Sequence, residues 1–440
     1  MTRPIIIAVL GVLSFSVDAG PSLQGGFDHE GEELPDPIKD PLAQEVLKRL
    51  TGPAPCEDGL AAGLFPCNGI DLVGYLSPSD LREGGTSGSN LWGFHSLNDD
   101  REYAVFGVNN GTSVVDVTDP ASPIVVGSVP GVVSSWREVK VYQFFSSDEN
   151  RYKAYAYVVS EGADAGLQIL DLNDLPNSVS LAATYTGFRT AHTVFLSNVD
   201  FATMVPNEDG IAPVLYIEGS NNGGLIALDI SDPVAPVALG RDTRSYAHDI
   251  WAGVLRGKRA TGCAAHDPCE LIANWTGNSL RLIDFTDKAN PITLSTYLYP
   301  GLGYAHSGWV SADGNYLFAM DELDEQRQGH NTWARVIDIR DLSNPFVAST
   351  WTGPTRAIDH NGYTVGNNYY MANYERGITV LDVTTPEDPQ EIAFFDTFPS
   401  ADEAAFHGAW GVYPFLPSGT ILVSNIDGPG GLFILQNSPP

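Results

Sequence analysis

The sequence predicts an all-β protein, a seven-bladed β-propeller closed by an N-terminal strand. The first observation is a recurring phrase, in which an apolar strand ends in Asp and runs into a turn that contains Asp and Pro. The copies are VVDVTDPASP from Val114, ILDLNDLPNS from Ile169, ALDISDPVAP from Ala227, LIDFTDKANP from Leu282, VIDIRDLSNP from Val336, VLDVTTPEDP from Val380 and a degenerate LFILQ from Leu432. The six full copies lie 44 to 58 residues apart. Because a unit of that length cannot bury a core alone, we expect the units to stack on one another.

The second observation is that each unit holds about four short apolar runs, separated by Gly, Pro, Asn and Asp. In the third unit the runs are Thr193 to Leu196, Val214 to Glu218, Leu225 to Ile230 and Pro236 to Leu239. Runs of this length and composition indicate β-strands. Four-stranded units in seven copies are typical of a propeller.

The third observation concerns closure of the ring. The last copy ends at Gln436, so its blade lacks an outermost strand within the remaining residues. The segment IDLVGY, Ile70 to Tyr75, resembles the outer strands at Pro123 to Ser128 and Pro236 to Gly240. We expect it to pair with the last strand, which removes two exposed sheet edges.

The N-terminal region divides into three parts. Residues 1–19 read as a signal peptide, with Arg3, an apolar run from Ile5 to Phe15 and small residues before a cleavage point after Ala19. Residues 20–55 read as a tether with a short helix from Pro41 to Leu50, capped by Asp40. Residues 56–440 form the propeller, and no segment is expected to span a membrane.

Composition restricts the partners. The chain has 54 Asp plus Glu against 23 Lys plus Arg, for a net charge of −31. Such a surface repels nucleic acid and suits divalent cations. DNA and RNA are therefore not expected as partners.

The four cysteines form two local pairs by spacing, Cys56 with Cys67 and Cys263 with Cys269. In an exported chain these pairs predict two disulfides, although three connectivities exist. Zinc binding is the competing interpretation. The second pair belongs to an insertion, Leu255 to Glu270, and this insertion and Asn198 to Pro213 are expected on the face opposite the predicted site.

Several ordered motifs carry a family resemblance. They are CEDGLAAGLFPCNGIDLVGYL from Cys56, LWGF from Leu91, AHDIW from Ala247, AHSGW from Ala305, MDELDE from Met320, IDHNGY from Ile358 and GAWGVYPFLPSG from Gly408. Over residues 56–436 the chain resembles the choice-of-anchor B proteins, which are exported bacterial proteins related to the LVIVD-repeat group. The resemblance implies a secreted or cell-surface propeller and supplies no established reaction.

Aligning the units places seven side chains at the start of the innermost strands. They are Trp92, Arg137, His192, His248, His306, His360 and His407. The second strands run antiparallel and return to the same face. Their ends carry Glu161 and Glu218, so one mouth of the propeller is predicted to present imidazoles beside carboxylates.

Two interpretations of these histidines remain open. Converging imidazoles are ligands for Cu, Zn, Fe or Ni, with His306 and His360 as the candidate hub-metal ligands. Alternatively, each histidine spans a junction between blades and bonds a carboxylate or a backbone carbonyl.

The strongest acidic candidate is the group Asp321, Glu322, Asp324 and Glu325, in a long connection that also holds His330. Four carboxylates offer hard oxygen ligands suited to Ca²⁺. The competing interpretation is a solvated acidic loop.

The function predicted from these features is an exported extracellular or cell-surface binding module with a mouth lined by His and carboxylates. Its expected partner is an extracellular protein, peptide or carbohydrate. The alternative is a metal-dependent extracellular oxidase, hydrolase or polysaccharide lyase that uses the same mouth, with His306 or His360 and Glu218 or Asp321 as an acid/base pair and Arg137 as an anion clamp.

Overall fold

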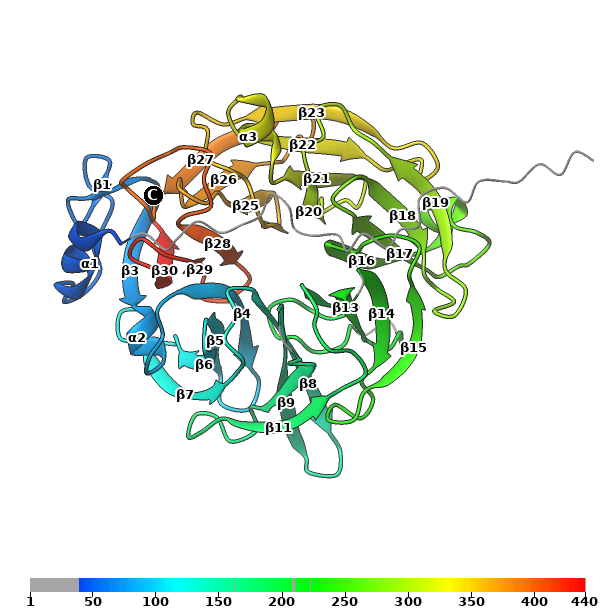
Figure 1. Ribbon diagram of the computed structural model, residues 1–440, viewed down its shortest axis with the longest axis horizontal. Coiled ribbons are helices and arrows are strands. Elements are labelled where there is room, and N and C mark those ends of the chain that lie inside the picture. Colours follow the sequence, from blue (N-terminus) through cyan, green and yellow to red (C-terminus); the bar gives the residue numbers. More distant parts are fainter. Residues whose placement is uncertain (1–38, 163, 208–209, 222, 440) are drawn as a thin grey trace, which may run out of the picture.

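Seven antiparallel sheets surround a central axis in the computed structural model, which describes residues 39–162, 164–207, 210–221 and 223–439 (Figure 1). The predicted signal peptide and most of the predicted tether lie outside the described residues. The seven-bladed propeller predicted from the repeats is confirmed.

The first four blades follow the chain in order. Blade one contains β4 (Gly88–Ser96), β5 (Arg101–Val108), β6 (Gly111–Asp116) and β7 (Ile124–Pro130). Blade two contains β8 (Arg137–Ser146), β9 (Arg151–Ser160), β10 (Leu167–Asp171) and β11 (Ser180–Tyr185). Blade three contains β12 (Val194–Leu196), β13 (Val214–Ser220), β14 (Gly224–Asp229) and β15 (Val237–Asp242). Blade four contains β16 (Asp249–Leu255), β17 (Cys269–Trp275), β18 (Leu280–Asp284) and β19 (Ile292–Tyr297).

Of the last three blades, blades six and seven include strands from the N-terminal region. Blade five contains β20 (Ala305–Val310), β21 (Tyr316–Asp321), β22 (Trp333–Asp338) and β23 (Phe346–Thr352). Blade six contains β24 (Gly362–Val365), β25 (Asn368–Ala372), β26 (Ile378–Asp382) and β27 (Gln390–Phe395), extended by β2 (Phe65–Asn68) and β1 (Leu60–Ala61). Blade seven contains β28 (Ala409–Tyr413), β29 (Thr420–Asn425), β30 (Gly431–Asn437) and β3 (Ile70–Leu76). The short helices are α1 (Pro41–Lys48), α2 (Pro78–Leu81), η1 (Gly257–Gly262) and α3 (Asp324–Gln328).

The repeated Asp has one structural role in six blades. It ends the third strand, and its carboxylate accepts a hydrogen bond from the backbone N–H two residues later. The pairs are Asp116 with Thr118, Asp171 with Asn173, Asp229 with Ser231, Asp284 with Thr286, Asp338 with Arg340 and Asp382 with Thr384. The carboxylate thus takes the place of a hydrogen-bond acceptor from a neighbouring strand and stabilises the turn of the backbone. This role explains why the Asp recurs at the same point of each repeat.

The ring closes as the sequence predicts. Strand β3 pairs antiparallel with β30, and Leu72 lies opposite Leu435. Strand β2 adds to the outer edge of blade six, where Cys67 lies opposite Phe395. The N-terminal segment therefore fastens two neighbouring blades, and Figure 1 shows its blue strands beside the red end of the chain. The predicted helix also forms, with Asp40 accepting from the N–H of Ala43.

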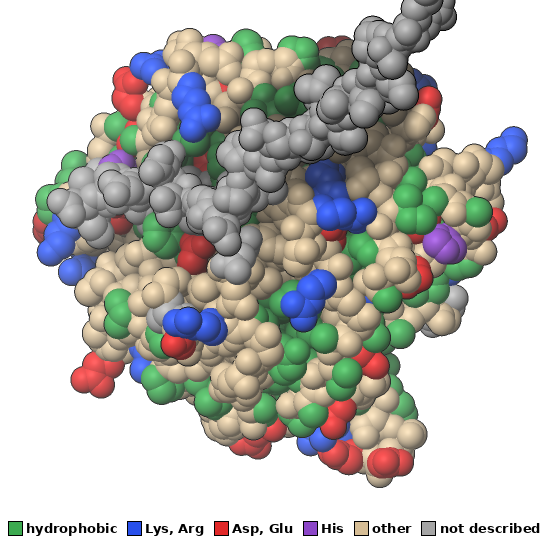
Figure 2. Space-filling view, turned by 45° about the vertical axis from the view of Figure 1, so that its right-hand side comes forward, with side chains coloured by type: hydrophobic (Ala, Val, Ile, Leu, Met, Phe, Trp, Pro, Cys, Tyr) green, Lys and Arg blue, Asp and Glu red, His purple; other side chains and the backbone are tan. Residues whose placement is uncertain are grey.

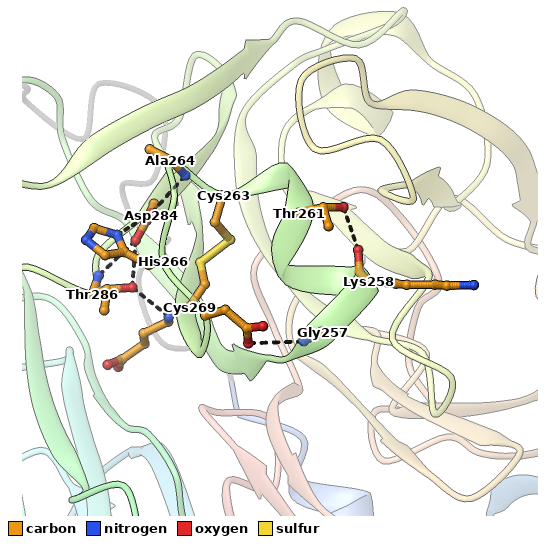
Figure 3. The surroundings of a disulfide bond; sticks show 11 residues. Gly257, Lys258, Thr261, Cys263, Ala264, His266, Cys269, Asp284 and Thr286 are labelled. Atoms are coloured by element: carbon orange, nitrogen blue, oxygen red, sulfur yellow. Dashed lines mark hydrogen bonds and ion pairs between the residues drawn. A yellow bond between two sulfur atoms is a disulfide. The ribbon is translucent and has the colours of Figure 1, made fainter.

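Both predicted cysteine pairs are disulfides, Cys56 with Cys67 and Cys263 with Cys269. A disulfide sulfur is not the thiolate that zinc requires, so the zinc interpretation of these cysteines is wrong. Figure 3 shows the second disulfide beside Asp284, which accepts hydrogen bonds from the N–H of Ala264 and from His266 Nδ1. This pair therefore staples the insertion onto blade four.

The first insertion contributes an aromatic side chain to the propeller axis. Phe201, from residues 198–213, packs its ring against Trp92 at 6.3 Å, Trp309 at 5.0 Å and Phe415 at 5.5 Å between centroids. These rings come from blades one, five and seven, so they meet at the propeller axis. The insertion therefore plugs the end of the channel opposite the histidines, because aromatic side chains fill it.

Among the described residues, no helix is both long and apolar enough to cross a bilayer. On the face in Figure 2, Lys and Arg side chains are interspersed with Asp and Glu. The visible described surface thus shows no continuous basic stretch of the kind that binds nucleic acid.

Candidate functional site

One equivalent residue per blade lies at the start of the innermost strand, at one end of the channel. Nδ1 of His248 bonds the carbonyl of His306 at 3.1 Å, and Nδ1 of His360 bonds the carbonyl of Trp410 at 2.6 Å. His306 and Trp410 therefore occupy equivalent positions in blades five and seven. The alignment of the sequence had placed His407 in blade seven and Trp92 in blade one, whereas the structure places Trp410 and Gly88 there.

A second series of contacts supports this register. We call the equivalent residue at the start of each innermost strand the register residue. In three blades the next residue along the chain carries a hydroxyl, which donates to the backbone carbonyl of the register residue in the following blade. These bonds join Ser89 to Arg137, Thr193 to His248 and Ser307 to His360 at 2.6–3.1 Å. Ser89 follows Gly88, which identifies Gly88 as the register residue of blade one.

Four of the predicted histidines form a continuous arc. The ring centroids of His192 and His248 are 4.2 Å apart, those of His248 and His306 are 4.4 Å apart, and those of His306 and His360 are 4.2 Å apart. All four side chains are buried. The convergence predicted from the sequence is thus present for these four residues.

The hydrogen bonds fix how two of these rings are oriented. A backbone carbonyl can only accept, so Nδ1 of His248 and of His360 carries the proton. In the neutral ring, Nε2 then keeps its lone pair. His192 differs, because its Nδ1 lies 3.1 Å from Oε2 of the predicted mouth residue Glu161.

Glu322 is the carboxylate of this site, although the sequence analysis had grouped it with the calcium candidates. Its Oε2 lies 3.6 Å from Nε2 of His306, and its Oε1 lies 3.5 Å from Nε2 of His360. Tyr374 donates its hydroxyl to Oε1 of Glu322 at 2.6 Å. One ligand atom each from His248, His306 and Glu322 lies within 4.8 Å of the other two.

The opening above the imidazoles is narrow and aromatic. Trp136, Trp410, Tyr374 and Phe406 line it together with the histidines, and its volume is about 10 Å³. The rings of Trp136 and Trp410 meet edge to face at 6.4 Å. A space of this size holds about one water molecule or ion. A much larger hollow of about 330 Å³ lies between α1, α2 and residues 427–430, and none of the other predicted site residues lines it, although Asp427 at its wall bonds His407.

Below the imidazoles lies a charged layer that the sequence analysis missed. Glu138, Lys140 and Asp249 line a cavity of about 20 Å³ with Asn361. Lys140 pairs with Glu138, and its ammonium lies 4.2 Å from the centroid of the Trp92 ring. The signal was available, because Glu138, Asp249 and Asn361 each follow a register residue directly.

Burial shifts the acid–base properties of this layer. It raises the pKa of Asp249 to about 7. It also raises the pKa of Glu218 well above its usual value. Glu218, a predicted mouth residue, is fully buried beneath the imidazoles and accepts a hydrogen bond from Thr193 at 2.6 Å.

Two predicted mouth residues are engaged elsewhere. The guanidinium of Arg137 donates to the carbonyls of Val108 and Val132 and to the hydroxyl of Ser160, and burial lowers its pKa to about 10. Its donors therefore hold a blade junction instead of an anion. His407 bonds Asp427 at 2.8 Å and stacks on Phe398.

The predicted calcium group is buried and divided. Asp321, Glu322, Asp324 and Glu325 are each at most 3% exposed, so the interpretation as a solvated loop is wrong. Asp321 accepts from the N–H groups of Gly303 and Tyr304 and from the Tyr299 hydroxyl. Glu322 faces the histidines, and Asp324 and Glu325 lie on α3. The four carboxylates therefore do not form one site.

Comparison with known proteins identifies the repeat. The LVIVD repeat matches residues 102–130 and 215–242. These segments contain the second to fourth strands of blades one and three. No curated protein matches the chain significantly.

Solved structures of similar shape include a Lactobacillus plantarum protein, at 13% identity and a TM-score of 0.48 over 76% of this chain and 88% of that one. Two putative 6-phosphogluconolactonases are also similar. The one from Bacteroides uniformis has 13% identity and a TM-score of 0.45 over 77% and 89% of the two chains. The one from Bacteroides fragilis has 11% identity and a TM-score of 0.46 over 78% and 89%. The chain is thus a seven-bladed β-propeller that contains LVIVD repeats.

Proposed function

We propose that this protein is an exported binding module, secreted or on the cell surface, whose ligand engages a transition-metal ion in the histidine mouth. The observation that carries the proposal is the position of Glu322 between the Nε2 atoms of His306 and His360, at 3.6 and 3.5 Å. These separations exceed hydrogen-bond lengths. Each separation has the length of a tetrahedron edge, about 3.3–3.6 Å for ligands about 2.0–2.2 Å from one metal. The two histidines approach different oxygens of Glu322, so one metal would use Oε2 with His306 or Oε1 with His360.

The contacts behind the ligands support the same site. Metal-binding imidazoles commonly donate the other ring N–H to a carbonyl or carboxylate, and ligating carboxylates are themselves hydrogen-bonded. His248 and His360 meet this condition through the carbonyls of His306 and Trp410, and Glu322 meets it through Tyr374. Imidazole with carboxylate suits Zn, Cu, Fe or Ni.

The shape of the mouth favours binding over turnover of a large substrate. A volume of about 10 Å³ admits one donor group to the imidazoles, so the rest of a ligand would lie on the rim. Trp136 and Trp410 on that rim offer rings that stack on a sugar or on a side chain of a peptide. The proposed partner is therefore an extracellular protein, peptide or carbohydrate with a metal-binding group. Two disulfides support an oxidising compartment outside the cytosol.

A metal-dependent extracellular enzyme, an oxidase, hydrolase or polysaccharide lyase, is the second candidate. The observation that favours it is the set His248, His306 and Glu322, because two imidazoles and one carboxylate leave a fourth position open in catalytic zinc sites.

The test is elemental analysis of untagged protein beside a His306→Ala, His360→Ala double variant. We expect close to one Cu, Zn, Fe or Ni per chain in the wild type and loss of that metal in the variant. His95→Ala is the matched control, because His95 lies at the other end of an inner strand and contacts Asp100. Circular dichroism checks that each variant folds.

A second variant probes the carboxylate. Tyr374→Phe removes the hydroxyl that bonds Glu322, and we expect metal affinity to fall about 10- to 100-fold in a chelator competition. Tyr369→Phe, in β25 shortly before Tyr374, should leave the affinity unchanged. A wild type without transition metal, or metal retained in the double variant, would overturn the proposed site. If the double variant loses the metal as expected, and the metal-loaded wild type also turns over a model substrate, the result would favour the enzyme.

A further inference from the structure

A second group of potential ligands lies at the junction of blades five and six, within residues 321–333 that connect β21 to β22. The connection packs on blade six, because Thr332 N–H donates to the Thr355 carbonyl and the Thr332 hydroxyl donates to the Ala357 carbonyl. Asp359 follows two residues later in blade six. The chain thus brings α3 and Asp359 to one junction.

The group is buried and has an excess of negative charge. Asp324, Glu325 and Asp359 are all 0% exposed. The buried cation among them is Arg335, which donates to Asp324 Oδ2 at 2.5 Å. With Asp321, which also faces Arg335, four carboxylates and one guanidinium leave three negative charges when all are ionised, so one divalent cation would neutralise most of the excess. A buried charge without a partner is strongly disfavoured, so this excess calls for a ligand or for bound protons.

The ligand atoms converge. One atom each from Asp324, Glu325 and His330 lies within 4.8 Å of the other two, and His330 Nε2 is 3.6 Å from Asp324 Oδ2. The His330 ring stacks on Trp333 at 3.6 Å, which holds it in place. Asp359 lies beside this three-residue group and outside it: burial raises the pKa of Glu325, and Asp359 is the neighbouring charge that raises it most.

Unsatisfied oxygens provide the independent observation. Within the described chain, no other residue donates an N–H or a neutral hydroxyl to either carboxylate oxygen of Asp359, to Oδ1 of Asp324 or to Oε2 of Glu325, although the Asp324 and Glu325 carboxyls themselves are within hydrogen-bonding reach of each other. Buried polar atoms are nearly always paired, and exceptions commonly mark a bound ion or water. Four such oxygens at one junction are explained more simply by one bound cation than by four unrelated unsatisfied groups.

We propose that Asp324, Glu325 and Asp359, assisted by His330, bind one hard divalent cation, Ca²⁺ or Mn²⁺. Carboxylate oxygens are the ligands of such ions, and an imidazole is compatible with Mn²⁺. The site does not include Asp321 or Glu322, whose carboxylate oxygens accept hydrogen bonds from other residues. The proposal does not depend on metal binding at the mouth. Because Glu322 lies two residues before Asp324, the cation would also hold in place the segment that carries Glu322.

The experiment is a thermal-unfolding titration of chelator-treated full-length protein with Ca²⁺, Mn²⁺ and Mg²⁺. We expect Ca²⁺ or Mn²⁺ to raise Tm by at least about 3 °C at about 100-fold above its dissociation constant. Asp359→Asn should lose this rise and bind at least tenfold more weakly. Its metal-free Tm should equal or exceed that of the wild type, because an unpaired buried charge is removed, and this shows that the variant folds.

Asp396→Asn is the matched control, another buried carboxylate to amide change, and it should keep the cation effect. Tb³⁺ provides a direct readout, since Trp333 beside His330 can sensitise its emission. That emission should vanish in Asp359→Asn and persist in the His306→Ala, His360→Ala variant. No change in Tm with any cation, or an undiminished effect in Asp359→Asn, would overturn the site and leave protonated carboxyls as the explanation. Loss of the effect only in the His variant would assign the cation to the mouth.

Discussion

At the residue scale, the geometry of the mouth histidines is compatible with both interpretations that the sequence left open. Nδ1 of His248 and Nδ1 of His360 each bridge to the next blade, as expected for histidines at blade junctions. The Nε2 atom of His360 faces Glu322, as expected for a metal ligand. Because a neutral imidazole carries one proton, the bond from Nδ1 to a carbonyl leaves Nε2 with the lone pair that coordination requires.

Asp396 gives a prediction at the same scale. Burial raises its pKa well above the usual value, Asp402 and Glu375 raise it further, and the Phe398 N–H and Arg376 oppose this. A raised pKa in the folded state stabilises the protein fully below the unfolded pKa of about 3.9, and that contribution is lost as pH rises through the folded value.

We therefore expect the free energy of unfolding to fall as pH rises above about 4, by up to about 1.4 kcal/mol per pH unit from this group. Asp396→Asn keeps an acceptor for the Phe398 N–H, should flatten the slope and should be more stable than the wild type at pH 8. Urea unfolding at several pH values measures this. An unchanged slope in the variant would contradict the assignment.

At the element scale, neighbouring blades are joined where the Asp-Pro turn of one blade meets a glycine in the outer strand of the previous blade. A Cβ on Gly74 in β3 would lie 2.2 Å from the Pro120 carbonyl oxygen, and one on Gly240 in β15 would lie 1.8 Å from the Lys288 carbonyl oxygen. The repeat phrase therefore defines a turn and also the surface that fits the preceding blade.

Gly240→Ala should destabilise the protein by ~1–3 kcal/mol, because the new methyl group meets backbone that cannot rotate away. Gly52→Ala is the control, since nothing lies within 4 Å of its Cβ position. Equilibrium unfolding in urea compares the two variants. Equal stability of the two would show that the turn can move away from β15.

The architecture was predictable because the repeat depends on short-range chemistry, namely the Asp turn and the alternating strands. The residues that occupy the equivalent position in every blade could not all be predicted. The inner strand of blade one is irregular between Gly88 and Leu91, and blades five and seven share one irregularity, between Ala305 and Ser307 and between Ala409 and Gly411. Matching the repeats by sequence placed His192, His248, His306 and His360 correctly, but it misplaced Trp92 and His407, because the side chains at the equivalent positions in blades one and seven are not alike.

The acidic group shows a second limit. Adjacent residues were assigned to one site because they are adjacent, but β21 ends at Asp321 and α3 begins at Asp324. The change of backbone direction sends Glu322 to the mouth and Asp324 to the blade junction. Asp359 lies in the next blade, so only packing reveals it.

At the scale of the whole molecule, the N-terminal segment fastens the ring at blades six and seven. The Ala54 N–H donates to the Leu72 carbonyl, and the Cys56 N–H donates to Asp71. The Cys56–Cys67 disulfide then ties this segment to β2 on blade six. The second disulfide staples only an insertion.

Cys56→Ser, Cys67→Ser should therefore lower the free energy of unfolding by about 2–3 kcal/mol, from chain entropy and from loosening of the closure. Cys263→Ser, Cys269→Ser should cost less, since it leaves the ring contacts intact. Calorimetry without reductant compares the two. A larger loss from the second pair would contradict the role given to the N-terminal segment.

The pairing of β3 with β30 also imposes an order on folding. Ser438 donates to Asp71 across 367 positions of the chain. At about 5–20 residues per second, a ribosome that has synthesised β3 needs roughly 20–70 s more to synthesise its partner β30. Six blades complete their inner four strands from contiguous chain, but the edge of β3 that pairs with β30 stays open until residues 431–437 emerge. A nascent chain that stalls before Gly431 thus holds one open edge on β3 and one on β29, and any factor that shields β3 during that interval would govern the yield of closed rings.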